Sequence, residues 1–337
     1  MFIVRNVTEN DLEDLFQLSK QALLLNLPQD KDIIKSKINK SISSFSEPNK
    51  QDISQNHFIF CLEDLSCNKV VGVSMIHGQH GTLSKPHFYL RVGSEKRTSE
   101  TLNKNYIHET LKFGHESNGY SEIGGLVLDK NYRGHPDKLG KLLSLSRFLF
   151  IAEKKELFTG EIHSELMPPL TDEGSSLLWE AIGRKFFEME YWEADKLSQT
   201  NKEFILNLFP QGTIYTKLLP DGARQAIGKV GKDTLPVQKM LGNIGFKYTN
   251  EVDPFDGGPH YRAPRDQITI VRDSKYLDAT LTKTNVSKNA ISSLLNLDNL
   301  YFACVYTHVN EQGKCAIDES SLRGSKLNSN KIRTYLL

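Results

Sequence analysis

The chain has 337 residues, of which 38% are apolar and 25% are charged, and its formal net charge is +1. These values are typical of a soluble globular protein with one large domain or two moderate ones. A net charge near zero gives no bulk attraction to nucleic acid or to a membrane surface, so we expect neither partner. The sequence contains no apolar run of about 18 residues, so we expect no membrane span. The first residues do not match a signal peptide.

The cysteines favour a reducing compartment. Cys61, Cys67, Cys304 and Cys315 form no C-x-x-C pair, and no cysteine or histidine cluster has zinc-finger spacing. Scattered thiols of this kind behave as small apolar residues. We therefore predict a cytoplasmic protein without a metal site.

The N-terminal part predicts a sheet with one early helix. Thr8 and Asp11 match a capping box ahead of a helix that begins at Leu12. The Ser-rich segment 41–55 predicts a loop. Four β-rich runs predict strands, the middle two as an antiparallel hairpin: 2–6, 57–64, 69–77 and 88–92.

The most informative segment runs from Gly125 to Lys154. An apolar strand, 125–128, leads into a basic turn that contains glycine, and the turn opens an amphipathic helix predicted for 138–154. Backbone amides and the positive end of a helix dipole form an anion cradle in such a place. Arg133, Lys138 and Lys141 add positive charge. An ordinary strand-turn-helix joint with solvated lysines gives the same pattern, so both interpretations stay open.

The rest of the chain continues a mixed pattern of strands and helices. A weak internal echo, helix then glycine then phenylalanine, occurs at 175–187 and at 234–246 and suggests two related half-domains, although such endings are common by chance. The hairpin precedes the cradle, so the order favours an α+β mixed sheet with flanking helices over a Rossmann fold. The predicted strands after the cradle helix are 161–167, 186–191, 267–272, 301–308 and 333–336. The predicted domains are 1–195, 196–262 and a β-rich tail, 263–337.

Several segments, in order along residues 1–260, resemble the arginine N-succinyltransferase family of the GNAT acyl-CoA transferase superfamily. They are Leu128–Arg133, Leu142–Phe148, Gly183 with Phe186–Phe187, Ile214–Thr216, Ala226–Val230 and, most specifically, Phe255–Pro259. The resemblance implies a GNAT-like fold and transfer of a succinyl group from succinyl-CoA to the α-amine of arginine. It also implies assembly into a homo- or hetero-oligomer.

The resemblance assigns the cradle to CoA. The backbone of Leu126, Val127 and Leu128 would hold the pantetheine arm, and one of its amides would polarise the thioester carbonyl. The same three residues also fit a plain core strand. The phosphates would lie against the turn and the start of the helix, at Arg133, Lys138, Leu139, Gly140 and Lys141.

Three departures from the family pattern limit this assignment. Lys138 stands where the acyl-CoA loop usually has glycine, Trp179 where GNAT enzymes often have a tyrosine acid, and Gly231 where the family has a histidine regarded as the proton donor. They motivate an alternative function, a catalytically inactive homologue that binds acyl-CoA or arginine as a sensor or subunit.

Other residues could replace the missing groups. The catalytic candidates are Glu165, which alternates with His163 on a predicted strand, and His260. The alternative interpretations are that Glu165 is a plain paired carboxylate and that His260 is a turn histidine. Asp256 is the candidate for binding the guanidinium of arginine. The alternative interpretation is that its side chain only stabilises an Asx turn.

Overall fold

The computed structural model describes residues 1–21, 26–283, 287–298, 300–322 and 324–337. The chain divides into two compact units: unit 1 comprises 1–79, 121–162 and 264–337, and unit 2 comprises 80–120 and 163–263. Compactness therefore does not follow the borders predicted at residues 195 and 262, because the chain passes between the units at strand ends. The predicted half-domains stay a prediction.

Unit 1 contains a mixed sheet with helices on its faces. Its strands are β1 (Phe2–Asn6), β2 (His57–Asp64), β3 (Lys69–His80), β6 (Tyr120–Leu128), β11 (Lys275–Thr282), β12 (Ala290–Leu297), β13 (Leu300–Val309), β14 (Cys315–Asp318) and β15 (Lys331–Leu336). Its helices are α1 (Leu12–Ser19), α2 (Lys31–Ser46), α3 (Leu139–Glu153) and α9 (Thr269–Asp273). The strands β13, β1, β2, β3 and β6 are neighbours in that order.

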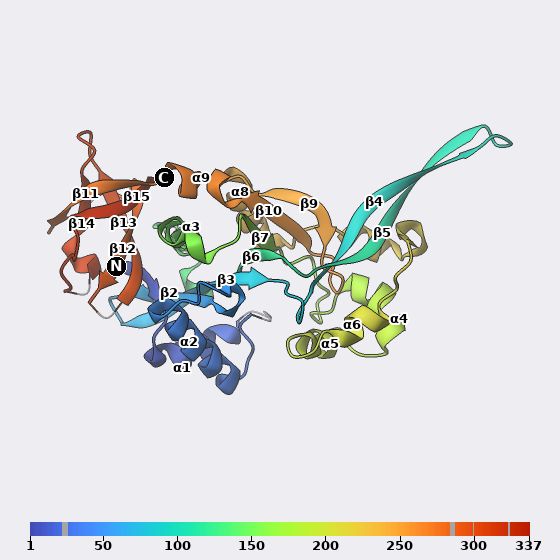
Figure 1. The fold of residues 1–337 in the computed structure, drawn as a ribbon, viewed down its shortest axis with the longest axis horizontal. Coiled ribbons are helices and arrows are strands. Elements are labelled where there is room, and N and C mark those ends of the chain that lie inside the picture. The colour runs from blue at the N-terminus through green and yellow to red at the C-terminus, as the bar shows by residue number, and fades with distance from the viewer. Residues whose placement is uncertain (22–25, 284–286, 299, 323) are drawn as a thin grey trace. The chain divides into compact units, whose positions relative to one another are not determined.

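The alternation of side chains along β2 divides the core of unit 1 into two layers. Ile59 and Cys61 face α1 and α2, where they pack with Leu15 and Ile38. Phe58 and Phe60 point the other way and contact Phe150 of α3, and Phe45 at the end of α2 reaches the same layer. Figure 1 shows α1 and α2 on one side of β2 and β3 and α3 on the other. Among the described residues, no helix is both long and apolar enough to cross a bilayer.

The loop predicted for 41–55 is wrong in its first part, because α2 continues to Ser46. The serines that suggested a loop face the sheet instead. Ser41 Oγ accepts a hydrogen bond from the amide of Ile59, and Ser44 Oγ accepts one from the amide of His57. Tertiary hydrogen bonds to β2 thus override the weak helix propensity of serine.

The tail forms a closed ring of strands. β12 pairs with β13 and β15, β15 with β11, β11 with β14, and β14 with β13. The ring encloses its own core, with Ile317 and Leu322 fully buried. The predicted strands 301–308 and 333–336 are confirmed by β13 and β15. The strand predicted for 267–272 is wrong: this segment is the short helix α9, whose Ile270 and Val271 are both buried.

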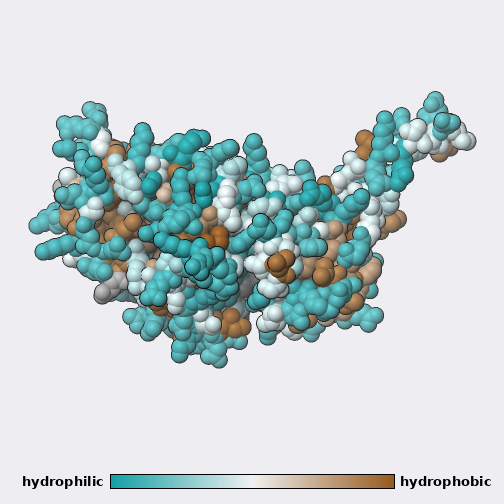
Figure 2. All heavy atoms as spheres, viewed as in Figure 1, coloured by the Kyte–Doolittle hydropathy of each residue, from teal (hydrophilic) through white to brown (hydrophobic). Residues whose placement is uncertain are grey.

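Unit 2 contains the remaining elements. Its strands are β4 (His87–Ser99), β5 (Lys104–Glu116), β8 (Ile214–Tyr215), β9 (Lys247–Val252), β10 (Pro259–Pro264) and the end of β7 (Glu161–Glu165). Its helices are α4 (Arg184–Phe187), α5 (Tyr191–Ser198), α6 (Glu203–Leu208), α7 (Asp221–Ala226) and α8 (Leu235–Asn243). The neighbour order is β7, β10, β9, β4, β5 and β8. The long hairpin of β4 and β5 extends well beyond its partner strands (Figure 1), and hydrophilic side chains predominate along it in Figure 2.

The predicted echo between 175–187 and 234–246 is not a structural repeat. Gly183 ends no helix: the π-helical turn Trp179–Gly183 continues into α4, so the strand predicted for 186–191 is wrong. A Cβ at Gly183 would overlap the Trp179 ring, which explains the glycine by close packing. In the second segment α8 does lead through Phe246 into β9.

A buried ion network joins the N-terminal turn to the sheet of unit 1. Arg5 binds Asp11 in a bidentate manner at 2.7 Å and Glu63 at 2.5 Å.

We expect Asp11→Ala to lower the free energy of unfolding by about 3 kcal/mol, because it leaves the buried guanidinium with one carboxylate. Urea unfolding measures this change. Glu9→Ala, an exposed acid in the same turn, is the control; equal losses in both variants would contradict the argument.

Candidate active site

A glycine with left-handed backbone lies inside β6, three residues before the end of the strand that leads into the cradle. Gly125 has φ 56°, a conformation that favours glycine, and a Cβ there would lie 2.9 Å from Met75 Sδ. Arg147 of α3, only 2% exposed, donates to the carbonyl of Gly124 at 3.3 Å and to Ser144 Oγ at 2.7 Å. These contacts fix the backbone of β6 directly before residues 126–128.

The turn after β6 satisfies most of its own amides. His135 donates to Tyr132 O, Asp137 to the His135 ring, and Lys138 to His135 O. Among the described residues, the amides of Leu139 and Gly140 donate to no protein acceptor. An anion site at this joint is therefore confined to the first turn of α3, where helix geometry leaves such groups unpaired.

Two lysines flank these free amides. Lys138 is exposed and precedes α3 with φ 50°, a left-handed conformation that glycine adopts at no steric cost. Burial, and then the charge of Lys138, lower the pKa of Lys141. Arg133 is exposed and donates weakly to Leu128 O at 3.4 Å. Like charges held close together are relieved when an anion binds between them.

In unit 2 the structure brings both predicted catalytic residues together. Glu165 Oε1 lies 3.8 Å from His260 Nε2, 3.4 Å from His163 Nε2 and 3.4 Å from His87 Nδ1. The three histidines are buried, at 3% exposure or less, whereas the Glu165 side chain is 30% exposed. We name these four residues the His/Glu cluster. Its geometry does not test a catalytic role.

Burial sets the charge state within the His/Glu cluster. Burial, followed by the neighbouring His163, lowers the pKa of His87 well below its usual value, so this imidazole is neutral at neutral pH. Burial opposes ionisation of Glu165, but the surrounding histidines outweigh it and hold the pKa of Glu165 well below its usual range. The cluster therefore presents one carboxylate to buried rings.

Asp256 lies in a group of carboxyls with raised pKa values. Burial raises the pKa of Asp195 to about 8 and that of Asp253 to about 7, and neighbouring carboxylates add to both shifts. The pKa of Asp256 is raised well above its usual value by burial and by Asp253. Asp253 accepts from the amides of Phe255 and Asp256, and Asp256 accepts from Gly258, so both also shape the turn. We name Asp195, Asp253 and Asp256 the carboxyl group of unit 2; a cation would stabilise their ionised forms.

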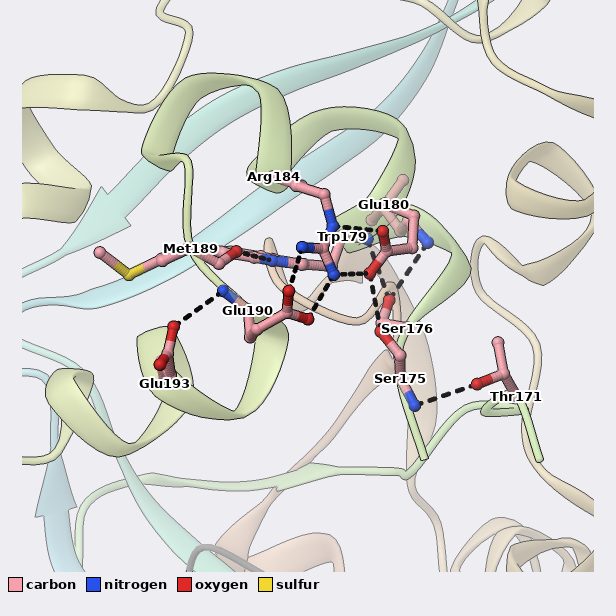
Figure 3. Close-up of polar contacts among 10 residues, drawn as sticks. Thr171, Ser175, Ser176, Trp179, Glu180, Arg184, Met189, Glu190 and Glu193 are labelled. Atoms are coloured by element: carbon pink, nitrogen blue, oxygen red, sulfur yellow. Dashed lines mark hydrogen bonds and ion pairs between the residues drawn. The ribbon is translucent and has the colours of Figure 1, made fainter. Parts of the chain in front are cut away.

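Two departures from the family pattern have a structural explanation. Trp179 is fully buried, and its indole donates to Met189 O at 3.1 Å, beside the Arg184 ion pairs with Glu180 and Glu190 (Figure 3). Gly231 donates to Met167 O at 2.9 Å, and a Cβ there would lie 2.9 Å from Pro168 O. Neither position offers a proton donor, and a side chain at 231 requires the backbone to move.

Sequence reasoning missed His87, Asp195 and Asp253. The alternation of His163 and Glu165 on one strand was the available signal, since residues two apart share a face. His87 opens β4 and Asp195 lies on α5, both far away in sequence. Single-sequence spacing carries no information about such long-range contacts.

The fold matches a solved structure of the arginine/ornithine succinyltransferase subunit AI from Pseudomonas aeruginosa. The TM-score is 0.83 at 23% identity, and the match covers 100% of this chain and 98% of the other. The predicted GNAT-like mixed sheet is thereby confirmed. The match shows that this chain has the fold of that subunit, a mixed sheet with helices on its faces.

The sequence comparisons identify the family. A family model described as the arginine N-succinyltransferase beta subunit matches residues 2–270. Arginine N-succinyltransferase of Yersinia pestis is 37% identical over 277 residues, which are 81% of this chain and 78% of the relative. The beta subunit of arginine N-succinyltransferase from Pseudomonas aeruginosa is 37% identical over 279 residues, 82% and 80% of the two chains. The chain therefore belongs to the arginine N-succinyltransferase family.

The contact at Gly231 generates a test. We expect Gly231→Ala to lower the free energy of unfolding by about 1–3 kcal/mol, because its Cβ would press on the Pro168 carbonyl. Gly212→Ala, whose Cβ would meet no atom within 4 Å, is the matched control. Both are compared by thermal and urea unfolding. A Gly231→Ala protein as stable as the Gly212→Ala protein would refute the steric argument.

Proposed function

We propose that the protein transfers the succinyl group of succinyl-CoA to the α-amine of arginine or a related amino acid. Membership of the arginine N-succinyltransferase family over residues 2–270 carries this proposal. The free amides at the start of α3, flanked by Lys138 and Lys141, supply a binding place for phosphate that agrees with it. The predicted cytoplasmic location and oligomeric assembly stay predictions.

Unit 1 supplies the groups for the acyl carrier. The amides of Leu139 and Gly140 and the side chains of Lys138 and Lys141 would bind the diphosphate, with Arg133 in reach of solvent-exposed phosphate. The backbone that follows Gly125, from Leu126 to Leu128, would align the pantetheine arm and donate to the thioester oxygen. A preorganised donor of this kind is worth roughly 3–4 kcal/mol in the transition state.

Unit 2 supplies the groups for the acceptor. The carboxyl group of unit 2 suits the guanidinium of arginine, which needs carboxylates in a fork-like arrangement. Its raised pKa values describe carboxyls that lack a cation, and a bound guanidinium would restore their ionised forms. The predicted contact at Asp256 thereby extends to Asp195 and Asp253.

The chemistry places modest demands on a base. The α-ammonium first loses a proton, and the neutral amine attacks the thioester carbon. The tetrahedral intermediate then loses a second proton from its nitrogen and expels the CoA thiolate. Since an α-amine has a pKa of about 7.7–8.0, deprotonating it near neutral pH costs about 1 kcal/mol. Solvent can accept that proton before the attack. The predicted catalytic roles of Glu165 and His260 stay predictions.

A thiol-release assay tests the proposed function. Purified protein is mixed with succinyl-CoA and arginine, and free CoA is measured with a thiol reagent, with succinylarginine identified by mass. We expect turnover that requires both substrates. Intact CoA binding without turnover, over a panel of amino-acid acceptors, would instead favour the inactive homologue that the changes at Trp179 and Gly231 suggested.

The cradle makes a separate prediction. Lys138→Ala and Lys141→Ala should each raise the Kd for CoA roughly two- to fivefold, since an exposed charge at a helix terminus contributes about 0.3–1 kcal/mol. Isothermal titration measures the affinity. Lys154→Ala, which removes the same charge at the other end of α3, is the control. Unchanged affinity in both cradle variants would place the phosphates elsewhere.

The carboxyl group predicts pH-dependent acceptor binding. Asp195 and Asp253, with pKa values of about 8 and 7, are largely protonated below pH 7 and must lose protons when a guanidinium binds. Affinity for arginine should therefore fall as the pH is lowered, by up to tenfold per unit below pH 7 for each carboxyl. Calorimetry in buffers of different ionisation enthalpy should detect proton release.

Two controls separate this linkage from other titrations. Asp195→Asn should release fewer protons, and citrulline, which lacks the guanidinium charge, should bind weakly and without the pH dependence. Arginine binding without proton release in the unsubstituted protein would exclude the carboxyl group of unit 2 as its site.

A further inference from the structure

The His/Glu cluster has a feature that the transferase chemistry does not require. Each of its four side chains offers one ligand atom, and these atoms all lie within 4.8 Å of one another. Three are imidazole nitrogens, and the fourth is a carboxylate oxygen. This set of donors is common in transition-metal sites of proteins.

The distances approach those of a tetrahedral site. Bonds of about 2.0–2.1 Å from zinc to nitrogen or oxygen place neighbouring ligand atoms about 3.3 Å apart. Glu165 Oε1 lies 3.4 Å from His87 Nδ1, 3.4 Å from His163 Nε2 and 3.8 Å from His260 Nε2. The four ligand atoms lie within 4.8 Å of one another, so metal binding requires the side chains to rotate toward a common centre.

Buried polar atoms point into the same place. His163 Nε2 faces Glu165 yet makes no hydrogen bond, and the side chain is 1% exposed. An unpaired buried polar atom usually costs about 1–3 kcal/mol. A metal ion would bind the lone pair that this nitrogen carries when the imidazole proton is on Nδ1.

The backbone holds the ligands in fixed positions. His163 and Glu165 are two residues apart on β7 and share a face. His260 lies on β10, which is anchored beside β7 by the bond from the amide of Leu166 to Pro259 O. His87 opens β4, and its ring centroid lies 4.9 Å from that of His163 and 5.1 Å from that of His260.

We propose that His87, His163, Glu165 and His260 bind one divalent transition-metal ion, with Zn²⁺ as the best match. Imidazole and carboxylate ligands suit zinc, whereas Mg²⁺ and Ca²⁺ prefer oxygen alone. Four protein ligands close the coordination sphere, so the ion is structural and joins β4, β7 and β10. This assignment replaces the sequence expectation of no metal and does not depend on the proposed transfer reaction.

Binding has one consequence for the surrounding contacts. Arg262 Nε donates to His163 Nδ1 at 3.3 Å, which leaves the proton of that imidazole on Nε2. A metal on Nε2 moves the proton to Nδ1 and removes this long hydrogen bond. Arg262 loses this hydrogen bond but keeps its ion pair with Glu251.

Metal content tests the proposal directly. The full-length protein is purified without a histidine tag, dialysed against a weak chelator, and assayed by elemental mass spectrometry. We expect about one zinc per chain, and cobalt substitution should give the strong visible absorption of a tetrahedral site. His163→Ala and Glu165→Gln should lower the affinity for zinc by roughly tenfold or more.

Matched variants guard against misfolding. His115→Ala removes an exposed histidine of the same unit that lies outside the cluster, and should keep the metal. Zinc should raise the Tm of the stripped parent and of His115→Ala but not that of His163→Ala. Glu165→Gln keeps the side-chain volume, which separates loss of metal from loss of packing.

The outcome is independent of the transferase assay. A parent protein that retains no zinc, cobalt, nickel or copper after dialysis, and whose Tm does not rise when these ions are added, would overturn the metal site while leaving the transfer reaction intact. Thiol release that persists in metal-free protein is compatible with a structural ion. A shift in the pH profile of thiol release that Glu165→Gln causes in metal-free protein would indicate that the cluster transfers protons instead of binding metal.

Discussion

The left-handed backbone at Gly125 is the constraint on which the proposed carrier site depends. A left-handed residue inside β6 is possible there because glycine has no Cβ to meet Met75. Arg147 then holds the carbonyl of Gly124 from inside α3, although it has no carboxylate partner among the described hydrogen bonds. Burial without an anion lowers the pKa of Arg147 to about 9. The strand is thereby bound to the middle of α3, about two turns after the free amides at the start of that helix.

The parts of this fold that local chemistry decides could be predicted from the sequence. The capping box at Thr8 and Asp11, the hairpin of β2 and β3, and α3 follow from patterns within a few residues. The failures have tertiary causes. Ser41 and Ser44 lie in a helix because β2 supplies their hydrogen-bond donors. Residue 183 is glycine because the Trp179 ring occupies the space of a side chain, and the helix continues through it.

The candidate sites also differ in how much of each could be predicted from local sequence patterns. Leu139 and Gly140 were predictable because a helix must leave its first amides unpaired. In the turn before them, His135, Asp137 and Lys138 satisfy their amides locally, which the sequence pattern does not show. The clusters of unit 2 needed the topology, because strands distant in sequence bring their members together. Glu165 and His260 were found as single residues, and the cluster around them was not.

The electrostatics of unit 2 connect its two proposed ligands. Glu165 raises the pKa values of Asp195, Asp253 and Asp256, so its negative charge is felt throughout the carboxyl group. A dication on Glu165 would neutralise that charge and lower the pKa values of the three aspartates. Arginine binding would then release fewer protons than it does in the metal-free protein. A structural ion in the His/Glu cluster would thus tune acceptor binding without touching the acceptor, because charge acts over distances that side-chain contacts do not reach.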